Sequence, residues 1–288
     1  MTNLILEDIA NSFSDNILST SSVSGGDINQ AIKIKLEREG EIFVKYNHSA
    51  PDDLFEKEGR GLALLRSSTD LIYIPEVLKV GKLTNGITYL ALEYLEPKSI
   101  GEKDFEQLGR GLAQLHSVRS SNFGLDYDNY IGTLLQKNDY KSTFHDFYWE
   151  MRIYPQLVLA ERDGKLNKND IDLAYQSYKK WDSIFPNEKA SLIHGDLWGG
   201  NVMNTLNKGI SIIDPAVYYG HREIEIAFTM LFGGFSSTFY SAYNTILPLE
   251  KGFDERIELY HLYPILVHAN LFGGHYVSRA KSIIKKYQ

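Results

Sequence analysis

The spacing of apolar residues changes near residue 95, and this change constrains the fold. Before it, apolar and polar residues alternate, as around Ile32 and Ile34, which is typical of strands with one buried face. After it, apolar residues recur every three or four positions, as in residues 105–115, which is typical of helices. The sequence predicts an α+β protein with two lobes. Residues 1–95 form a small antiparallel-sheet lobe with one helix, and residues 96–288 form a larger, mainly helical lobe across a cleft.

The first lobe is expected to contain two β-hairpins. Residues 28–46 form the first. Residues 77–80 and 87–94 form the second, with Asn85-Gly86 at its turn. The helix is expected to start near Pro51, because proline suits the first helical turn.

The second lobe is expected to be helical with one β-like insertion. Val202 and residues 210–213 flank a polar turn, so residues 201–214 resemble a short hairpin. Pro264 is expected to kink or divide the last helix, because proline has no amide hydrogen to donate. Besides the helix at 105–115, the pattern predicts helices at 142–160, 168–182, 221–232 and 255–283.

Composition excludes several classes of protein. The chain carries a net charge of −7 and no block of Lys or Arg, so it lacks the basic surface of a nucleic-acid binder. It has no cysteine, which excludes disulfides, thiolate metal sites and thiol nucleophiles. No apolar run approaches the roughly 20 residues that span a bilayer, and the acidic start is not a secretory signal. A cytoplasmic protein with no membrane partner is therefore expected; the sequence leaves the oligomeric state open.

The strongest motif is HGDLWGGN at residues 194–201, followed by Asp214 after the short hairpin. The five residues from Asp196 to Asn201 allow both side chains to face one cleft, and the hairpin returns Asp214 beside them. Phosphoryl transfer needs a carboxylate to accept the proton of the acceptor hydroxyl, and hard oxygen ligands to hold Mg²⁺. This constellation supplies both. The alternative is that Asp196 and Asn201 only cap turns.

A second pair of residues points to the same chemistry. Lys45 ends an apolar strand, and Glu58 lies on the apolar stripe of the following helix with Phe55 and Leu62. A buried carboxylate is costly unless a cation meets it, and Lys45 is the obvious partner. A strand lysine paired with a helix glutamate is how kinase folds place an ammonium against phosphates. The alternative is that Glu58 reaches water from the edge of the stripe.

Two weaker features suggest where a nucleotide would lie. Gly25 and Gly26 precede the Lys45 hairpin, and paired glycines let backbone N–H groups approach phosphate oxygens. A plain polar loop is the alternative. Glu93, Tyr94 and Leu95 end the small lobe, where a backbone hinge would hydrogen-bond adenine.

These motifs resemble the fructosamine/ketosamine-3-kinase family, a protein-kinase-like fold related to aminoglycoside phosphotransferases and choline kinases. The most specific run is HGDLWGGNVMN…IIDPAVYYGHREIEIAFTMLFGGF at residues 194–235. Similar stretches extend over nearly the whole chain. They are GGDINQA (25–31), FEKEGRGLALL (55–65), LALEYLE (90–96), GLAQLHS (111–117), FGLDYDNYIGTLLQKN (123–138) and LYPILVHANLFGGHY (262–276).

The resemblance implies a role for each matching residue. Asp196 would be the catalytic base, and Asn201 and Asp214 the Mg²⁺ ligands. Lys45 would hold the ATP phosphates, and Glu58 would orient Lys45. The family phosphorylates the 3-hydroxyl of ketosamines, which implies deglycation repair acting on a small ketosamine or a glycated protein.

Residues near the motif are candidates for other roles. Trp198 would contact the acceptor or pack beneath the loop, and His221 and Arg222 are further acceptor candidates, with an internal salt bridge as the alternative for Arg222. His194 is expected to hold the catalytic loop through hydrogen bonds rather than to react. Glu225 stands where the family usually has Asp, and we expect it to accept backbone N–H bonds near the catalytic loop.

Two rival functions remain open from the sequence. One is phosphotransfer to another small amino-alcohol, such as an aminoglycoside or a choline-like amine. The other is an inactive nucleotide-binding scaffold, against which the presence of every motif residue counts.

Overall fold

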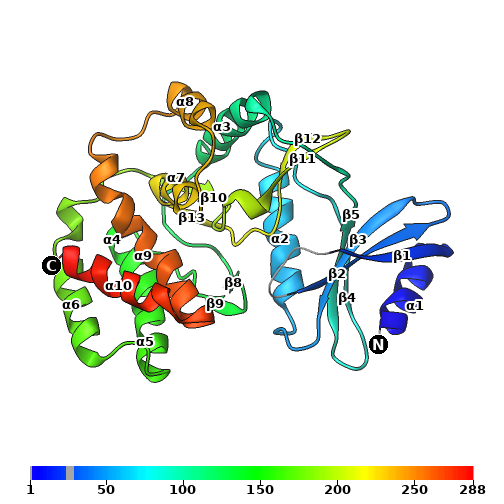
Figure 1. The fold of residues 1–288 in the computed structure, drawn as a ribbon, viewed down its shortest axis with the longest axis horizontal. Helices are drawn as coiled ribbons and strands as arrows, with labels where there is room; N and C mark the ends of the chain where they lie inside the picture. The colour runs from blue at the N-terminus through cyan, green and yellow to red at the C-terminus, as the bar shows by residue number, and fades with distance from the viewer. Residues whose placement is uncertain (1, 24–28, 288) are drawn as a thin grey trace.

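The computed structural model describes residues 2–23 and 29–287. Its helices and strands follow one another from the N-terminus to the C-terminus (Figure 1). In chain order they are α1 (Thr2–Phe13), β1 (Ile17–Val23), β2 (Gln30–Leu36), β3 (Glu41–Asn47), α2 (Leu54–Arg66), β4 (Val77–Lys82), β5 (Thr88–Glu93), β6 (Pro97–Lys98), α3 (Glu102–His116), β7 (Arg119–Ser120), β8 (Asn129–Ile131), β9 (Leu134–Gln136), α4 (Phe144–Phe147), α5 (Tyr154–Arg162), α6 (Lys168–Tyr178), β10 (Ala190–Ile193), β11 (Val202–Thr205), β12 (Gly209–Ile212), β13 (Tyr218–Gly220), α7 (Arg222–Leu231), α8 (Ser237–Ile246), α9 (Phe253–Phe272) and α10 (His275–Lys286).

The N-terminal part is a five-stranded antiparallel sheet in the order β1-β2-β3-β5-β4. Both predicted hairpins are confirmed: β2 pairs with β3, and β4 with β5. The sequence did not predict α1 or β1, so this part has two helices rather than one. Ile5 and Ile9 of α1 are fully buried against sheet residues that include Ile34 and Val44.

α2 joins a different core from α1. Its residues Leu54, Phe55, Leu62 and Leu65 belong to the large apolar cluster that continues through the C-terminal helices. In Figure 1, α2 lies between the sheet and the rest of the molecule. The helix therefore packs against both parts of the chain.

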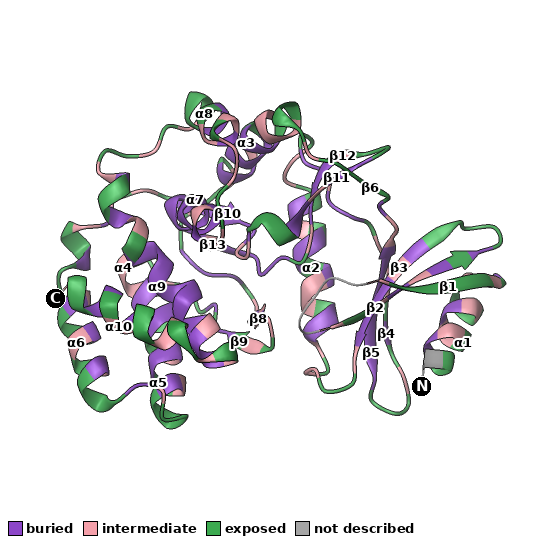
Figure 2. Ribbon diagram, in the orientation of Figure 1, coloured by how far each residue is buried: buried purple, intermediate pink, exposed green. Residues whose placement is uncertain are grey.

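The C-terminal part is mainly helical, as predicted. Two small sheets, β13-β10-β7 and β12-β11-β6, and the hairpin β8–β9 lie among its helices. The predicted hairpin within residues 201–214 is confirmed as β11–β12. α9 is largely buried, whereas α6 and α10 expose one side to solvent (Figure 2). None of the helices in the described part of the chain is long and apolar enough to cross a membrane.

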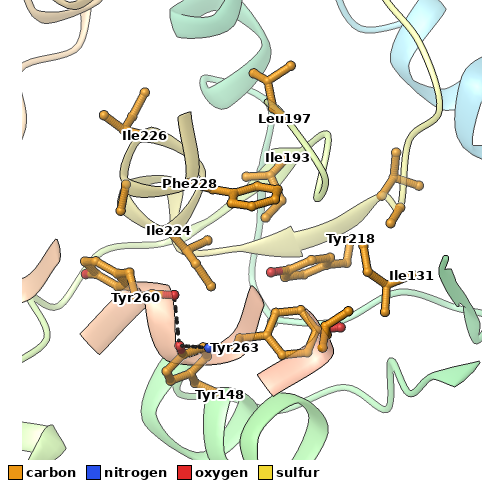
Figure 3. Packing of buried hydrophobic residues seen from close by; sticks show 14 of the residues in the cluster. Ile131, Tyr148, Ile193, Leu197, Tyr218, Ile224, Ile226, Phe228, Tyr260 and Tyr263 are labelled. Carbon is orange, nitrogen blue, oxygen red and sulfur yellow. Dashed lines mark hydrogen bonds between the residues drawn. The ribbon is translucent and has the colours of Figure 1, made fainter. Parts of the chain in front are cut away.

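Pro264 does not divide the last helical region. It lies inside α9, and the break comes at Gly273-Gly274, where both residues have positive φ. A proline leaves the carbonyl four residues earlier without its helical donor, which here is that of Tyr260. The Tyr148 hydroxyl lies 2.8 Å from the Leu259 carbonyl and 3.1 Å from the Tyr260 carbonyl. It also accepts from the Tyr263 N–H at 3.2 Å (Figure 3). A side chain from outside α9 thus supplies a donor and an acceptor to the turn before Pro264.

α8 was not predicted, because its sequence is rich in Ser, Thr and Asn, which favour helices weakly. Its buried residues Phe239, Ala242 and Tyr243 fall three and four positions apart. They face α3, where a Cβ added at Gly109 would collide with the Phe239 carbonyl. Packing against α3 therefore outweighs weak local propensity, and the predicted α+β class is confirmed.

Candidate active site

A cleft of about 510 Å³ contains the residues of the predicted constellation. Lys45 and Glu58 reach it from the N-terminal part of the chain, and Asp196, Asn201 and Asp214 reach it from the C-terminal part. The chain therefore brings together five side chains that are up to 169 positions apart in the sequence. Gly25 and Gly26, predicted to approach the phosphates, lie outside the described residues.

The loop that carries Asp196 is held by hydrogen bonds from both sides. It follows the buried strand β10. His194 Nε2 lies 2.9 Å from the Ile213 carbonyl, and the Asp196 N–H donates to His194 Nδ1 at 3.3 Å. The Ile213 N–H donates to the Asn201 carbonyl at 3.0 Å. His194 thus ties the loop to the residue before Asp214, which confirms its predicted structural role.

The side chain of Glu225, on α7, binds the backbone of the same loop. Its carboxylate accepts the N–H groups of His194 at 3.1 Å and Gly195 at 2.7 Å, as predicted. His116 of α3 lies 2.9 Å from the same carboxylate and is fully buried. Burial opposes ionisation of Glu225, but the hydrogen bond from His116 and the loop N–H groups hold its pKa below the ordinary value. A buried anion therefore fixes the backbone next to Asp196.

Asp196 lies in an environment that disfavours its charge. Burial and the nearby Asp214 carboxylate raise the pKa of Asp196 to about 7, against the opposing effect of the Asn201 hydrogen bond. The Asn201 amide nitrogen donates to the Asp196 carbonyl at 2.8 Å and to its carboxylate at 3.2 Å. A carboxylate with a pKa near neutrality can exchange a proton readily with a bound hydroxyl.

The predicted pair of Lys45 and Glu58 is present. Lys45 Nζ contacts the Glu58 carboxylate and lies 2.7 Å from Asp214 Oδ1. Burial alone would lower the pKa of Lys45, but the Asp214 and Glu58 carboxylates outweigh it and hold the pKa above its ordinary value. Burial raises the pKa of Glu58 to about 7 although Lys45 opposes the shift. One ammonium thus serves two carboxylates, which leaves excess negative charge at the cleft.

Asn201 and Asp214 fit the oxygen chemistry of Mg²⁺. The amide nitrogen of Asn201 is used by Asp196, which leaves its amide oxygen available to a cation. Asp214 has a φ of 57°, uncommon for a residue with a side chain, and its carboxylate is half exposed in the cleft. Within the described residues no three His, Cys, Asp or Glu side chains form a metal cluster. Mg²⁺ takes one or two carboxylates and fills its other positions with phosphates and water.

Two of the three predicted hinge residues use their backbone N–H groups in hydrogen bonds within the chain. The Glu93 N–H donates to the Glu76 carbonyl at 3.1 Å, and the Tyr94 N–H donates to the Glu41 carbonyl at 3.3 Å. Leu95 is the one of the three whose N–H has no acceptor among the described residues. None of the three lines the cleft itself.

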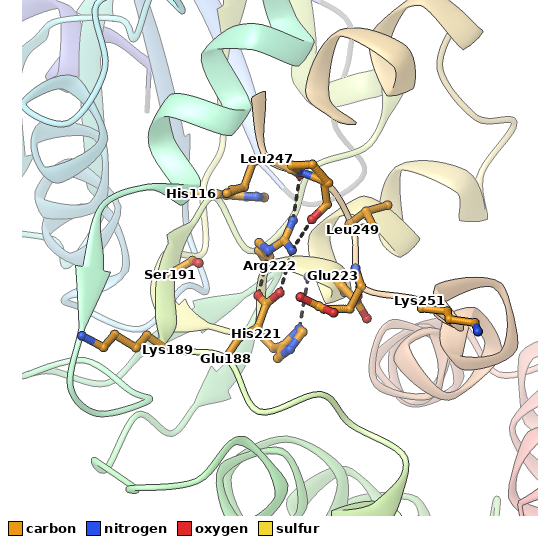
Figure 4. Close-up of polar contacts among 12 residues, drawn as sticks. His116, Glu188, Lys189, Ser191, His221, Arg222, Glu223, Leu247, Leu249 and Lys251 are labelled. Carbon is orange, nitrogen blue, oxygen red and sulfur yellow. Dashed lines mark hydrogen bonds and ion pairs between the residues drawn. The ribbon is translucent and has the colours of Figure 1, made fainter. Parts of the chain in front are cut away.

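Trp198 lines the cleft, but two other acceptor candidates do not. Trp198 is 40% exposed, so packing beneath the loop as core is wrong. His221 is fully buried and caps α7, where its Nδ1 accepts the Glu223 N–H. Arg222 is 2% exposed and pairs with Glu188 at 2.6 Å, as Figure 4 shows. Assigning His221 and Arg222 to substrate contact is therefore a mistake, because their side chains turn into the protein.

The sequence missed the wall of the cleft opposite α2. The signal was that residues 194–235 and 262–276 resembled the family as stretches, without indicating which side chains face the cleft. This wall is apolar and aromatic, which suits an organic acceptor better than a phosphate. Its residues are Phe228, Phe232, Val267, His268, Leu271, Phe272 and Tyr276.

Comparisons with known proteins identify the family of the chain. A model of the fructosamine kinase family matches residues 1–288. A relative from Vibrio parahaemolyticus, named as a probable ketoamine kinase, is 41% identical over 276 residues, which are 95% of this chain and 94% of the relative. A relative from Arabidopsis thaliana, named protein-ribulosamine 3-kinase, chloroplastic, is 37% identical over 276 residues, which are 94% of this chain and 83% of the relative.

Solved structures give the same result. A structure described as a fructosamine-3-kinase from Haemophilus somnus 129PT matches with a TM-score of 0.88 and 32% identity, covering 98% of this chain and 96% of that one. The aminoglycoside phosphotransferase APH(4)-Ia, in a complex with AMP-PNP and hygromycin B, matches with a TM-score of 0.65 and 16% identity over 97% of both chains. The second likeness shows the shared fold. The chain therefore belongs to the fructosamine kinase family.

Proposed function

We propose that the protein transfers the terminal phosphoryl group of ATP to the 3-hydroxyl of a ketosamine. One observation carries this function: Asp196, Asn201, Asp214 and the ion pair of Lys45 with Glu58 line one cleft. Family membership supplies the substrate class, since relatives are named as ketoamine and ribulosamine kinases. The phosphorylated adduct would then decompose and release the amine, which is a deglycation repair role.

Asp196 acts as the base in this proposal. It accepts the proton of the 3-hydroxyl as that oxygen attacks phosphorus, and a pKa of about 7 leaves a substantial fraction ionised at neutral pH. Lys45 binds the phosphates, and Glu58 holds the ammonium in place. Direct transfer needs no covalent phosphoenzyme, because positioning and electrostatics provide the catalysis.

Asn201 and Asp214 would hold Mg²⁺, which offsets phosphate charge when bound. The Leu95 N–H is the free hinge donor for adenine, and Gly25 and Gly26 remain the proposed phosphate loop. We place the boundary between the nucleotide lobe and the catalytic lobe at residues 95 and 96. A cytoplasmic location is proposed with the reaction, because it consumes ATP.

The acceptor is proposed to lie between Trp198 and the part of the apolar wall that α9 and α10 contribute. Trp198 is exposed at the cleft beside Asp196, and its ring lies 6.1 Å from that of Phe232 in an edge arrangement. Flat apolar surfaces of this kind bind the carbon face of a sugar-derived chain.

Mass spectrometry on a panel of acceptors tests the function. Purified protein, ATP and Mg²⁺ are incubated with ribulosyl-lysine, fructosyl-lysine, an aminoglycoside and choline, and the products are examined for one added phosphate. Phosphate on the ketosamines at the 3-hydroxyl is the expected result. Phosphate on the aminoglycoside or choline alone would move the protein to the rival phosphotransferase class. Nucleotide binding without any transfer would make it a scaffold.

A further inference from the structure

A segment of the C-terminal part reaches across to α2, the helix that carries Glu58. The Tyr130 hydroxyl of β8 donates to Asp53 Oδ1 at 2.6 Å. The guanidinium of Arg60 lies 3.7 Å from the centre of the Tyr127 ring and 3.5 Å from Asp126 Oδ2. These two contact points lie on either side of Glu58 in the sequence. Figure 1 shows β8 beside the lower part of α2.

The contacts fall on one side of α2. Asp53, Lys57 and Arg60 are spaced by four and three positions, so they share a face of the helix. Asp53 immediately precedes α2 but makes no side-chain capping bond to it. Its carboxylate is used instead by Tyr130, with Lys57 Nζ 3.7 Å away. The residue that would ordinarily stabilise the helix start is thus committed to a tertiary contact.

The other sides of α2 are also occupied. A Cβ added at Gly59 would lie 3.4 Å from Val80 of the sheet. One added at Gly61 would lie 3.2 Å from Val217, three residues beyond Asp214. The C-terminal part therefore contacts α2 in two places, through residues 126–130 and through the segment after Asp214. A shift of α2 would move Glu58 relative to Lys45.

We propose that Tyr130 is a positioning residue, which holds α2 through Asp53 so that Glu58 stays on Lys45. Tyr130 belongs to the C-terminal part of the chain, which also carries Asp196. Through Asp53, this part of the chain holds the Lys45–Glu58 pair in position. Burial and the Asp53 hydrogen bond raise the pKa of Tyr130 to about 12, so its hydroxyl remains a donor at neutral pH. The expected effect of Tyr130 on turnover rests on the proposed kinase function, whereas its effect on the position of α2 does not.

Two matched substitutions separate this role from general packing. Tyr130 lines the cleft, so direct substrate contact is the alternative role to be separated from positioning. Tyr130→Phe removes only the hydroxyl that binds Asp53. Tyr127→Phe is the control, because the Tyr127 hydroxyl is buried without a hydrogen-bond partner among the described residues, and the Phe ring still lies under Arg60. We expect Tyr130→Phe to lower kcat/KM for ATP about fivefold to tenfold, the range for loss of one hydrogen bond. The KM for the acceptor should stay within twofold, and Tyr127→Phe should match wild type.

A second pair of variants tests the path through Asp53. Asp53→Ala removes the acceptor of the Tyr130 hydroxyl, and Asp53 does not line the cleft. Asp52→Ala is its control, since Asp52 is exposed and pairs with the exposed Lys82. The positioning role predicts that Asp53→Ala reproduces the ATP defect, that Tyr130→Phe adds nothing further to it, and that Asp52→Ala has no effect. A Tyr130→Phe defect in acceptor KM alone would overturn the proposal, because it would indicate direct substrate contact.

Hydrogen–deuterium exchange gives a readout that does not depend on the reaction. We expect amides in α2 to exchange at least fivefold faster in Tyr130→Phe, while those of α3 stay as in wild type. Faster α2 exchange in a protein that phosphorylates no ketosamine would retain the positioning role and reject the proposed function. Unchanged α2 exchange with unchanged kcat/KM for ATP would reject the positioning role, whatever the substrate.

Discussion

Glu225 is the residue whose replacement most directly tests how the catalytic loop is held. One carboxylate oxygen accepts the Gly195 N–H at 2.7 Å. The other accepts the His194 N–H at 3.1 Å and lies 2.9 Å from His116 Nε2. Burial lowers the pKa of His116, so its ring is neutral, and its Nδ1 is 2.8 Å from the Tyr243 hydroxyl. The carboxylate is therefore surrounded by two backbone N–H groups, which can only donate, and by His116 Nε2, which can also donate.

Glu225→Gln keeps the size of the side chain but cannot satisfy this arrangement. Its NH₂ group must face a backbone N–H, that of Gly195 or that of His194, so one buried donor is left without an acceptor. A hydrogen bond to a charged group contributes about 1.5–3 kcal/mol, and an unsatisfied buried donor costs about 1–3 kcal/mol. We expect the free energy of unfolding to fall by about 2–4 kcal/mol, which lowers Tm by roughly 3–7 °C for a chain of this size. The loop should also lose its geometry, with at least a tenfold drop in kcat.

Urea unfolding and steady-state kinetics measure both effects. Glu225→Asp is one control: it keeps the charge with a shorter reach, so we expect a loss of about 1 kcal/mol and an active enzyme. Glu106→Gln is a second control, since Glu106 forms an exposed pair with Arg110, and such pairs contribute about 0–1 kcal/mol. A Glu225→Gln protein with wild-type kcat and stability within about 0.5 kcal/mol would refute the reasoning.

Three further outcomes are expected. Asp196→Asn should bind ATP normally, as measured by calorimetry, yet lose at least about 10²-fold in kcat, whereas near-wild-type turnover would exclude Asp196 as the base. Lys45→Met should mainly impair nucleotide use, so unchanged affinity and rate with ATP would count against the pair with Glu58. Burial lowers the pKa of His221 to about 4 from 6.5. Between these pH values the unfolded chain therefore binds more protons than the folded chain. The free energy of unfolding should fall by about 3 kcal/mol as the pH drops from 6.5 to 4. His221→Asn should remove this part of the pH dependence, and urea unfolding at several pH values that showed the same slope in both proteins would contradict it.

Much of the site could be predicted because it depends on short spacings. Asp196 and Asn201 are five residues apart in one loop, and a hairpin of fixed length returns Asp214. The pairing of Lys45 with Glu58 followed from the cost of burying a lone carboxylate. Such inferences need only local geometry and the hydrophobic pattern.

The errors concern residues whose direction is set by distant neighbours. His221 and Arg222 stand in the most family-like run, yet α7 begins there and turns both side chains inward. Arg222 bonds to Glu188 and to the carbonyls after α8, and His221 packs against the Tyr260 ring. Pro264 was expected to kink or divide a helix, but α9 continues through it, and the Tyr148 hydroxyl contacts the turn before it. No pattern around position 264 could indicate a partner 116 residues earlier.

By itself, the sequence determined the α+β class, the main hairpins, the loop that carries Asp196 and the ion pair of Lys45 with Glu58, since periodicity and the cost of unpaired charge act over a few residues. Only the tertiary structure decided which side chains line the cleft, that Glu225 and His116 support the loop, and that Tyr130 reaches Asp53. These contacts join segments from different lobes and helices. Packing and hydrogen-bond satisfaction of the whole chain select them, and no local window of residues contains both partners.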